Sequence, residues 1–151
     1  MNSSDINFTY PVLGFSSDGD LYGFPDLDRL TKCGPRTLRD AWYNGLELVE
    51  ADLKRWRVLS VRRTGRAGSL LRLLWIFGPP RSRVELELEN MAPILMGEVQ
   101  ERACKAMEIM KEDYYGEEGQ KEYEDTLKNI RKAPSVATLY GLLNPDTFEG
   151  Y

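Results

Sequence analysis

The sequence contains no histidine and only two cysteines among its 151 residues. Without histidine, the chain cannot carry a serine–histidine–aspartate or cysteine–histidine catalytic group, nor a histidine metal site. Cys33 and Cys104 are too far apart in the sequence to form a zinc motif. We expect two free thiols in a reducing compartment, with a single disulfide as the alternative. No glycine-rich phosphate-binding motif is present, so the residues imply no cofactor.

Long apolar runs are also missing. The longest, residues 70–77, is interrupted by Arg72 and is far shorter than the roughly 20 residues that a membrane helix needs. The first residues have neither a basic region nor a long apolar core, so they do not resemble a secretory signal. We therefore expect a soluble, cytoplasmic protein, and the chain length predicts one domain over residues 1–151.

Charge is unevenly distributed along the chain. Residues 1–51 carry 4 basic and 8 acidic side chains, residues 52–84 carry 9 and 1, and residues 85–151 carry 7 and 15. The net charge of −4 therefore hides a basic middle between two acidic ends. This segregation predicts either internal pairing of the two kinds of charge or two surfaces of opposite sign.

Strict alternation of apolar and charged residues marks positions 83–89. Val84, Leu86 and Leu88 point to one side of a strand, and the glutamates between them point to the other. Such a strand has one dry face and one wet face. It predicts a one-sided sheet with a cover over the dry face.

Other segments also have strand character, and short connections join them. Short connections favour antiparallel neighbours, so the sequence predicts a meander of about five or six strands. Residues 70–77 are apolar on both faces and are expected in the centre of the sheet. The expected strands besides residues 83–89 are residues 7–15, 21–24, 46–50, 55–63 and 70–77.

The expected strand over residues 55–63 contains a change of phase. Trp56 and Val58 share one face, whereas Leu59 and Val61 share the other. This change indicates a β-bulge, or burial on both sides of the strand.

After Asn90 the apolar period changes from that of a strand to that of an amphipathic helix. The long helix over residues 92–115 is expected to lie across the sheet and to cover the apolar residues of the strand at 83–89. Strands first and helices last are typical of the α+β class. We predict an antiparallel meander sheet covered on one face by C-terminal helices, with residues 144–151 as a tail. The other expected helices are residues 25–32, 35–43, 120–132 and 136–143, with Asp26, Pro35 and Ser135 at the starts of three of them.

Carboxylates are the plentiful acid–base groups. Glu85, Glu87 and Glu89 line one strand face and could act as a pair of the kind that glycosidases use. The favoured interpretation is a solvated face, or pairing with arginines on the next strand. Cys33 is a candidate for an activated thiol at a helix start, although a half-buried structural cysteine is the favoured interpretation.

Residues 54–83 form a basic segment with interspersed tryptophans. Phosphate contacts together with base stacking could bind nucleic acid. The competing interpretation is that the arginines pair with Glu47, Glu50, Glu85 and Glu87 on flanking strands, and the negative net charge favours it. The segment comprises Lys54, Arg55, Arg57, Arg62, Arg63, Arg66, Arg72, Arg81 and Arg83, with Trp56 and Trp75 between them.

Residues 112–125 form an acidic segment that also contains Tyr114, Tyr115 and Tyr123. Tyrosine among carboxylates is typical of interface hot spots, so the segment is a candidate docking face for a basic protein partner. The competing interpretation is a solvated corner between two helices. The candidate partner-binding residues are Glu112, Asp113, Tyr115, Glu117, Glu118, Glu122 and Glu124.

The chain as a whole has a distinctive order of segments. These are Asp-Leu-Tyr-Gly-Phe (20–24), Asp-Leu-Asp-Arg-Leu-Thr (26–31), Ala-Trp-Tyr-Asn-Gly-Leu-Glu-Leu-Val-Glu (41–50), Arg-Trp-Arg-Val (55–58), Val-Glu-Leu-Glu-Leu (84–88) and Ile-Arg-Lys-Ala-Pro-Ser (130–135). This layout resembles that of small bacterial immunity proteins from polymorphic-toxin and contact-dependent-inhibition systems. The resemblance covers most of the chain.

The resemblance implies a cytoplasmic protein, not an enzyme, that binds one cognate toxin domain and blocks its active site. Affinity would come from complementary charge and a few aromatic anchors. Many such toxins are nucleases with basic clefts, where an acidic face could take the place of a phosphate backbone. The resemblance implies no cofactor and no membrane partner. The alternative function is a nucleic-acid-associated module built on the basic segment.

Overall fold

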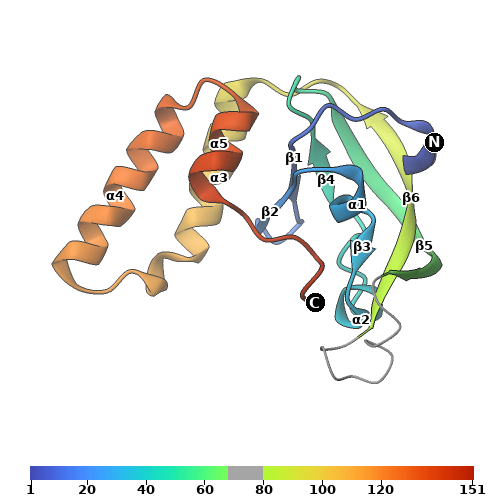
Figure 1. Ribbon diagram of the computed structural model, residues 1–151. Helices are drawn as coiled ribbons and strands as arrows, with labels where there is room; N and C mark the ends of the chain where they lie inside the picture. Colours follow the sequence, from blue (N-terminus) through green and yellow to red (C-terminus); the bar gives the residue numbers. More distant parts are fainter. Residues whose placement is uncertain (68–79) are drawn as a thin grey trace.

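The computed structural model describes residues 1–67 and 80–151 (Figure 1). The fold is α+β, as the sequence predicts: six antiparallel strands of the described residues form one curled sheet, in the order β2-β1-β4-β5-β6-β3. The strands are β1 (Val12–Phe15), β2 (Leu21–Phe24), β3 (Lys32–Cys33), β4 (Glu47–Val49), β5 (Arg55–Ala67) and β6 (Arg81–Met91). The helices are α1 (Leu27–Leu30), α2 (Pro35–Arg39), α3 (Met96–Ile109), α4 (Gly116–Lys132) and α5 (Val136–Leu143), with 3₁₀ turns η1 (Ser3–Asp5) and η3 (Lys111–Asp113).

Strand β5 contains the predicted bulge. Its pairing with β6 shifts register between Val58 and Ser60, which leaves Leu59 as an extra, half-exposed residue. The bulge changes the phase of the strand, so Val61 packs against the same core as Trp56 and Val58. The interpretation of the apolar pattern as a bulge is therefore confirmed.

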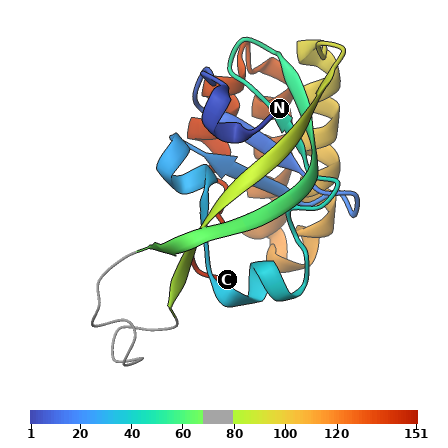
Figure 2. The ribbon, with the colours of Figure 1, turned by 90° about the vertical axis from the view of Figure 1, so that its right-hand side faces the viewer.

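The two longest strands form one twisted ribbon, which crosses the molecule in Figure 2. The expected central strand over residues 70–77 lies outside the described residues. Strands β5 and β6, which flank those positions in the sequence, pair directly with each other. Strand β3, which was not expected, pairs with the other edge of β6 through Lys32 and Cys33. Two residues are too few to show any periodicity.

The C-terminal segment joins the two edges of the sheet. Gly23 of the edge strand β2 donates a backbone hydrogen bond of 3.0 Å to Asp146, and Gly34, directly after the other edge strand, donates one of 3.1 Å to Phe148. Residues 144–151 therefore close the curled sheet toward a barrel. The expectation of a tail is wrong, because Phe148 is fully buried and anchors the segment in the core.

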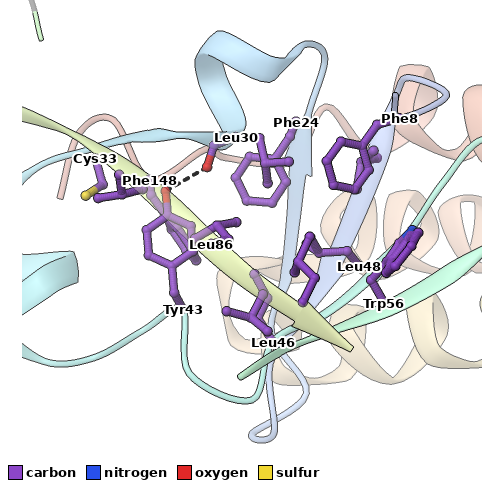
Figure 3. Packing of buried hydrophobic residues seen from close by; sticks show 14 residues of the cluster. Phe8, Phe24, Leu30, Cys33, Tyr43, Leu46, Leu48, Trp56, Leu86 and Phe148 are labelled. Carbon is purple, nitrogen blue, oxygen red and sulfur yellow. Dashed lines mark hydrogen bonds between the residues drawn. The ribbon is translucent and has the colours of Figure 1, made fainter. Parts of the chain in front are cut away.

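An aromatic core fills the inside of the curled sheet (Figure 3). The Phe148 ring lies 4.8 Å from the Tyr43 ring and 5.5 Å from the Phe24 ring, centroid to centroid. The Tyr43 hydroxyl donates a hydrogen bond of 2.8 Å to the Leu30 carbonyl, so its burial leaves no polar atom unpaired.

The alternation in β6 is confirmed, but its expected cover is not. Val84, Leu86 and Leu88 are buried and face the aromatic core inside the curl. The prediction that the long C-terminal helix covers them is wrong. Phe8 from the N-terminal segment and Leu30 from α1 pack there instead. Alternation identifies which face of a strand is dry, but it does not identify the element that lies over it.

The C-terminal helices cover the opposite face of the sheet, behind β1 and β4. Leu13 and Phe15 of β1 and Val49 of β4 share a second core with residues such as Val99 of α3 and Ile130 of α4. Figure 1 shows α3 and α5 next to the sheet and α4 as the outermost helix. The sheet is thus buried on one face by its own curl, and helices cover the other face at β1 and β4 but not along β5 and β6.

The helix boundaries follow the predicted capping residues at two starts. The Asp26 carboxylate accepts a hydrogen bond of 2.8 Å from the Arg29 amide at α1, and the Ser135 hydroxyl accepts one of 3.2 Å at α5. The long helix ends earlier than expected, at Ile109, and α4 begins earlier, at Gly116, where φ is +70°. A 3₁₀ turn therefore lies at the corner where a continuous helix was expected.

The cysteines are free and buried in different cores, Cys33 inside the curl and Cys104 under the helices. The expectation of two free thiols is confirmed. Burial raises the pKa of Cys33 to about 11. An activated thiol needs a lowered pKa, so the structural interpretation of Cys33 holds. In the part of the chain that the structure describes, no helix combines the length and apolar character needed to cross a membrane.

Candidate partner-binding site

The predicted acidic residues gather at the corner between α3 and α4, at the lower left of Figure 1. Two of them lie in η3, Tyr115 lies directly before α4, and the others lie in the first turns of α4. We call this surface the acidic corner. It consists of Glu112, Asp113, Tyr115, Glu117, Glu118, Glu122 and Glu124, all of which are exposed. Tyr115 is 81% exposed and is the prominent aromatic side chain of the surface.

The carboxylates of the acidic corner form no ion pair within the part of the fold that the structure describes. Among the described residues, none of them lies within 4.0 Å of a lysine or arginine nitrogen. Carboxylates elsewhere are paired, as Glu47 is with Arg102 at 2.6 Å and Asp28 with Lys32 at 2.7 Å. Positions 108–125 contain eight acidic and only two basic side chains. The corner therefore carries a concentrated, uncompensated negative charge.

Packing behind the corner fixes its shape. The Tyr114 and Tyr123 rings lie 5.6 Å apart, and the Lys111 ammonium lies 5.6 Å from the centroid of the Tyr123 ring. A side chain at Gly119 would meet the Tyr114 backbone at 2.9 Å, so glycine is needed for this close approach. Tyr123 is buried. It supports the corner from within, contrary to the interpretation that placed it on the docking surface.

A groove of about 550 Å³ opens beside the acidic corner. One wall comes from β2, the turn after α2 and the C-terminal segment, and the other comes from α3, α4 and α5. Glu122 belongs to both the acidic corner and the groove, so the two are continuous. The sequence pattern did not predict the groove, because its walls come from widely separated segments. The groove is lined by Asp20, Leu21, Tyr22, Trp42, Ala106, Met107, Met110, Tyr114, Glu122, Thr126, Leu142, Leu143, Asn144, Pro145, Asp146 and Tyr151.

The groove is negatively charged and has aromatic walls. Its lining includes the carboxylates of Asp20, Glu122 and Asp146 but no lysine or arginine of the described residues. Burial raises the pKa of Tyr22, and the charge of Asp20 adds to the rise. The pKa of Tyr151 is raised mainly by the charge of Asp146. In both cases nearby carboxylates contribute to the rise in pKa, because their negative charge disfavours the tyrosinate anion.

Most of the described arginines in the basic segment are paired with carboxylates. At Glu47 and Glu85 this arrangement agrees with the competing interpretation, in which arginines pair with acids on flanking strands. Arg81 and Arg83 pair instead with acids of the C-terminal segment and α1, and Glu50 and Glu87 pair with no arginine among the described residues. Trp56 is buried, and its indole N–H donates a hydrogen bond of 2.7 Å to Glu50, so its ring does not offer a stacking surface. The pairs join Arg55 and Arg57 to Glu47, Arg62 to Glu85, Arg81 to Glu149, and Arg83 to Asp28.

Part of the basic segment is not accounted for by these pairs. Arg63 and Arg66 are exposed on β5, and neither forms an ion pair with a described residue. Arg72 and Trp75 lie outside the described residues.

Two glutamates of the row on β6, Glu85 and Glu87, contact neighbouring side chains. Glu85 accepts a hydrogen bond of 2.6 Å from Ser4 and pairs with Arg62, and these contacts lower its pKa. Glu87 accepts a hydrogen bond of 2.7 Å from Ser60 on β5. None of the three glutamates lines the groove. For Glu85, the favoured interpretation of pairing with an arginine on the next strand is confirmed.

Comparisons of the chain with protein families, with curated proteins and with solved structures found no match. The resemblance to immunity proteins therefore stays a prediction. The acidic corner, the adjoining groove and the pairing of charges are the observations that bear on function.

Proposed function

We propose that this chain is a binding protein of the immunity type, which neutralises a cognate bacterial toxin domain by covering its active site with the acidic corner. The observation that supports the proposal is the absence of internal ion pairs from the carboxylates of this corner, among the described residues. Carboxylates that have no ion pair within their own fold are available to pair with a partner. A basic partner would supply the missing cations on binding.

The chemistry of the corner fits an enzyme that acts on nucleic acid. A cleft that binds phosphates is lined with lysine and arginine, and a row of carboxylates can occupy the same positions as the phosphates. Tyr115 would contribute an aromatic contact beside the charges, because tyrosine buries a large rigid surface at low entropic cost. The fixed packing behind the corner limits the entropy lost on binding.

The proposal places the protein in the cytoplasm of the cell that it protects. Two buried free thiols, Cys33 and Cys104, are compatible with a reducing compartment. In this role the chain acts by occlusion and needs no cofactor and no membrane.

The test is to co-express the chain with the product of the gene next to its own, which the proposal expects to include a toxin domain. We expect a stable complex and survival of cells that otherwise stop growing. Glu117, Glu118 and Glu124 are then changed together to glutamine, which removes charge from the corner but leaves Glu122 in the groove. This triple variant is expected to associate about tenfold more slowly at low ionic strength, because steering by charge is reduced.

The matched control is a triple variant with the same change of net charge elsewhere, in which Asp5→Asn is combined with Glu87→Gln and Glu89→Gln. These residues are exposed and lie on η1 and β6. The control is expected to keep the association rate of the unaltered chain. Equal rates for the two triple variants would refute the acidic corner as the binding face. Thermal unfolding of both variants separates binding from folding, because Glu117 and Glu118 also stabilise the first turn of α4.

The alternative function, a nucleic-acid-associated module, has support from Arg63 and Arg66, which are exposed and form no ion pair with a described residue. A module of this kind would bind single-stranded DNA or RNA with an affinity that falls steeply as salt increases. Changing both arginines to glutamine would then weaken binding in low salt. Failure of the unaltered chain to bind either polymer in low salt would exclude this alternative.

A further inference from the structure

We propose that the groove beside the acidic corner receives an arginine side chain of the protein partner. This inference rests on the proposed function, because it assigns a specific contact within the same interface. The groove continues the acidic corner through Glu122. A partner seated on the corner therefore has the mouth of the groove beneath its edge.

The charge of the groove favours a cation. Asp20, Glu122 and Asp146 line it, and in the part of the chain that the structure describes no lysine or arginine does. None of these three carboxylates forms an ion pair with a described residue. Among the described residues, no cluster of carboxylates or thiols is arranged to hold a metal ion. The three acids come from separate segments of the lining, so an organic cation in the groove would meet them from different segments of the fold.

The aromatic walls favour guanidinium over ammonium. The Trp42 and Tyr151 rings lie 5.2 Å apart, and the Tyr22 ring lies 6.5 Å from Trp42. Trp42 already has the Arg36 guanidinium at 5.3 Å from its ring centroid, although Arg36 does not line the groove. Flat π-surfaces stack on a planar guanidinium, which also presents several N–H donors to carboxylates.

The wall that carries these groups is held in place by the fold. The Trp42 ring packs at 6.0 Å from the buried Phe148 ring. The backbone of Asp146 is fixed to β2 by the hydrogen bond from Gly23, and its carboxylate accepts one of 3.3 Å from Tyr151. A preorganised wall loses little entropy when a side chain enters.

The experiment uses the peptide acetyl-Gly-Arg-Gly-amide as the probe and follows the indole N–H resonance of Trp42 by NMR. A Trp42→Phe variant assigns this resonance. The matched probe contains citrulline in place of arginine, which keeps the shape but removes the charge. The arginine peptide is expected to shift the Trp42 resonance and to bind about tenfold more tightly than the citrulline peptide, because charge-assisted hydrogen bonds are lost in the second.

Two double variants locate the binding. Asp20→Asn combined with Asp146→Asn is expected to lower the affinity for the arginine peptide about tenfold, since neutral amides replace two carboxylates. The amide that replaces the Asp146 carboxylate would keep an oxygen that can accept the Tyr151 hydroxyl hydrogen bond. The control, Asp5→Asn combined with Glu89→Gln, makes the same change of charge on η1 and β6 and is expected to have no effect.

Three results would overturn the inference. The first is equal binding of the arginine and citrulline peptides. The second is tighter binding of free arginine than of the peptide, which would identify a site for a small metabolite. The third is an unchanged affinity of the Asp20/Asp146 double variant for the toxin domain.

Failure of this inference can be distinguished from failure of the proposed function. The peptide titration requires no toxin domain, and the corner variants leave the three groove carboxylates unchanged. If the corner variants weaken toxin binding while the groove variant does not, the proposed function stands and the assignment of the groove is wrong. If the groove variant weakens toxin binding and the corner variants do not, the inference is supported and the acidic corner is not the binding face.

Discussion

The backbone N–H of Gly34 donates a hydrogen bond of 3.1 Å to the carbonyl oxygen of Phe148, so the two ends of the sheet are tied through the last residues of the chain. Gly34 follows the edge strand β3, and the same C-terminal segment is bonded to Gly23 on the opposite edge strand. The Phe148 ring lies within 6.0 Å of the rings of four aromatic residues in and beside the core, Tyr22, Phe24, Trp42 and Tyr43. Closure of the curl and one wall of the groove therefore depend on the same segment.

Replacement of Phe148 by alanine should strongly destabilise the fold. A fully buried phenylalanine leaves a large cavity, and we expect a loss of about 3–5 kcal/mol in the free energy of unfolding. Urea denaturation followed by circular dichroism measures this loss. Leu95→Ala is the control, because Leu95 is 77% exposed and its replacement should change the free energy by about 0.5 kcal/mol or less. Similar values for the two variants would contradict an anchoring role for Phe148.

Glu50 is the one charged residue among the buried residues that the structure describes, and its replacement by glutamine should be destabilising. One carboxylate oxygen accepts a hydrogen bond of 2.6 Å from the Thr9 amide, and the other accepts one of 2.7 Å from the Trp56 indole. The glutamine amide would place its NH₂ group against one of these two donors. We expect a loss of about 1–3 kcal/mol in urea denaturation, compared with little change for the exposed Glu89→Gln. A Glu50→Gln variant as stable as the unaltered chain would show that the pair of hydrogen bonds contributes nothing net.

Local patterns in the sequence predicted β1, β2, β4, β5 and β6 and the caps at Asp26 and Ser135, because these depend on near neighbours, but they did not predict β3. Alternation at Val84, Leu86 and Leu88 identified β6, and the change of phase at Leu59 identified the bulge. The α+β class followed from the order of elements along the chain. The patterns did not identify which element packs on the apolar face of each strand. A curled sheet and a layer of helices are both compatible with the same alternation.

The acidic corner could be predicted from the sequence, whereas the groove could not. The acidic corner is continuous in sequence, so the positions of its residues on one surface could be predicted from Glu112 to Glu124. The groove could not, because Asp20, Trp42 and Asp146 meet only after the C-terminal segment crosses between the sheet edges. The available signal in the sequence was Phe148, an aromatic residue in a stretch without regular periodicity. It indicates that the segment packs against the core.

The ion pairs of Glu47 should make the stability depend on pH in the acid range. Burial by itself raises the pKa of Glu47, but the hydrogen bond from Arg102 and the charges of Arg102, Arg55 and Arg57 outweigh it, so the pKa lies below its ordinary value. A lowered pKa in the folded state contributes stability above the unfolded pKa of about 4.3, and this contribution is lost as pH falls through the folded value.

The Glu47→Gln variant should therefore lose less stability than the unaltered chain as pH falls below about 4.3. The measurement is the free energy of unfolding in urea at a series of pH values from neutral downward. Glu89→Gln removes an exposed carboxylate from β6 and serves as the control for the loss of a negative charge. Parallel curves for Glu47→Gln and the unaltered chain would contradict a lowered pKa at this position.

A change at Gly23 should affect the closure of the sheet and the groove together. A Cβ atom at this position would overlap the Pro145 ring and would lie 2.8 Å from the Tyr140 ring. Alanine must therefore push the C-terminal segment away from β2, and overpacking of this kind costs about 1–3 kcal/mol. Gly97→Ala is the control, because a Cβ atom there meets nothing within 4 Å.

The same Gly23→Ala variant, measured where it is still folded, should bind the arginine peptide more weakly than the Gly97→Ala control. The reason is that Asp146 accepts the backbone hydrogen bond from Gly23, so displacement of the segment moves a groove carboxylate away from Trp42 and Tyr22. A variant with lowered stability but full peptide affinity would show that the groove does not need the C-terminal segment in its present position. If Gly23→Ala is as stable as the unaltered chain, β2 accommodates a side chain where it contacts the C-terminal segment. The close packing of that segment against β2 would then not determine the closure of the sheet.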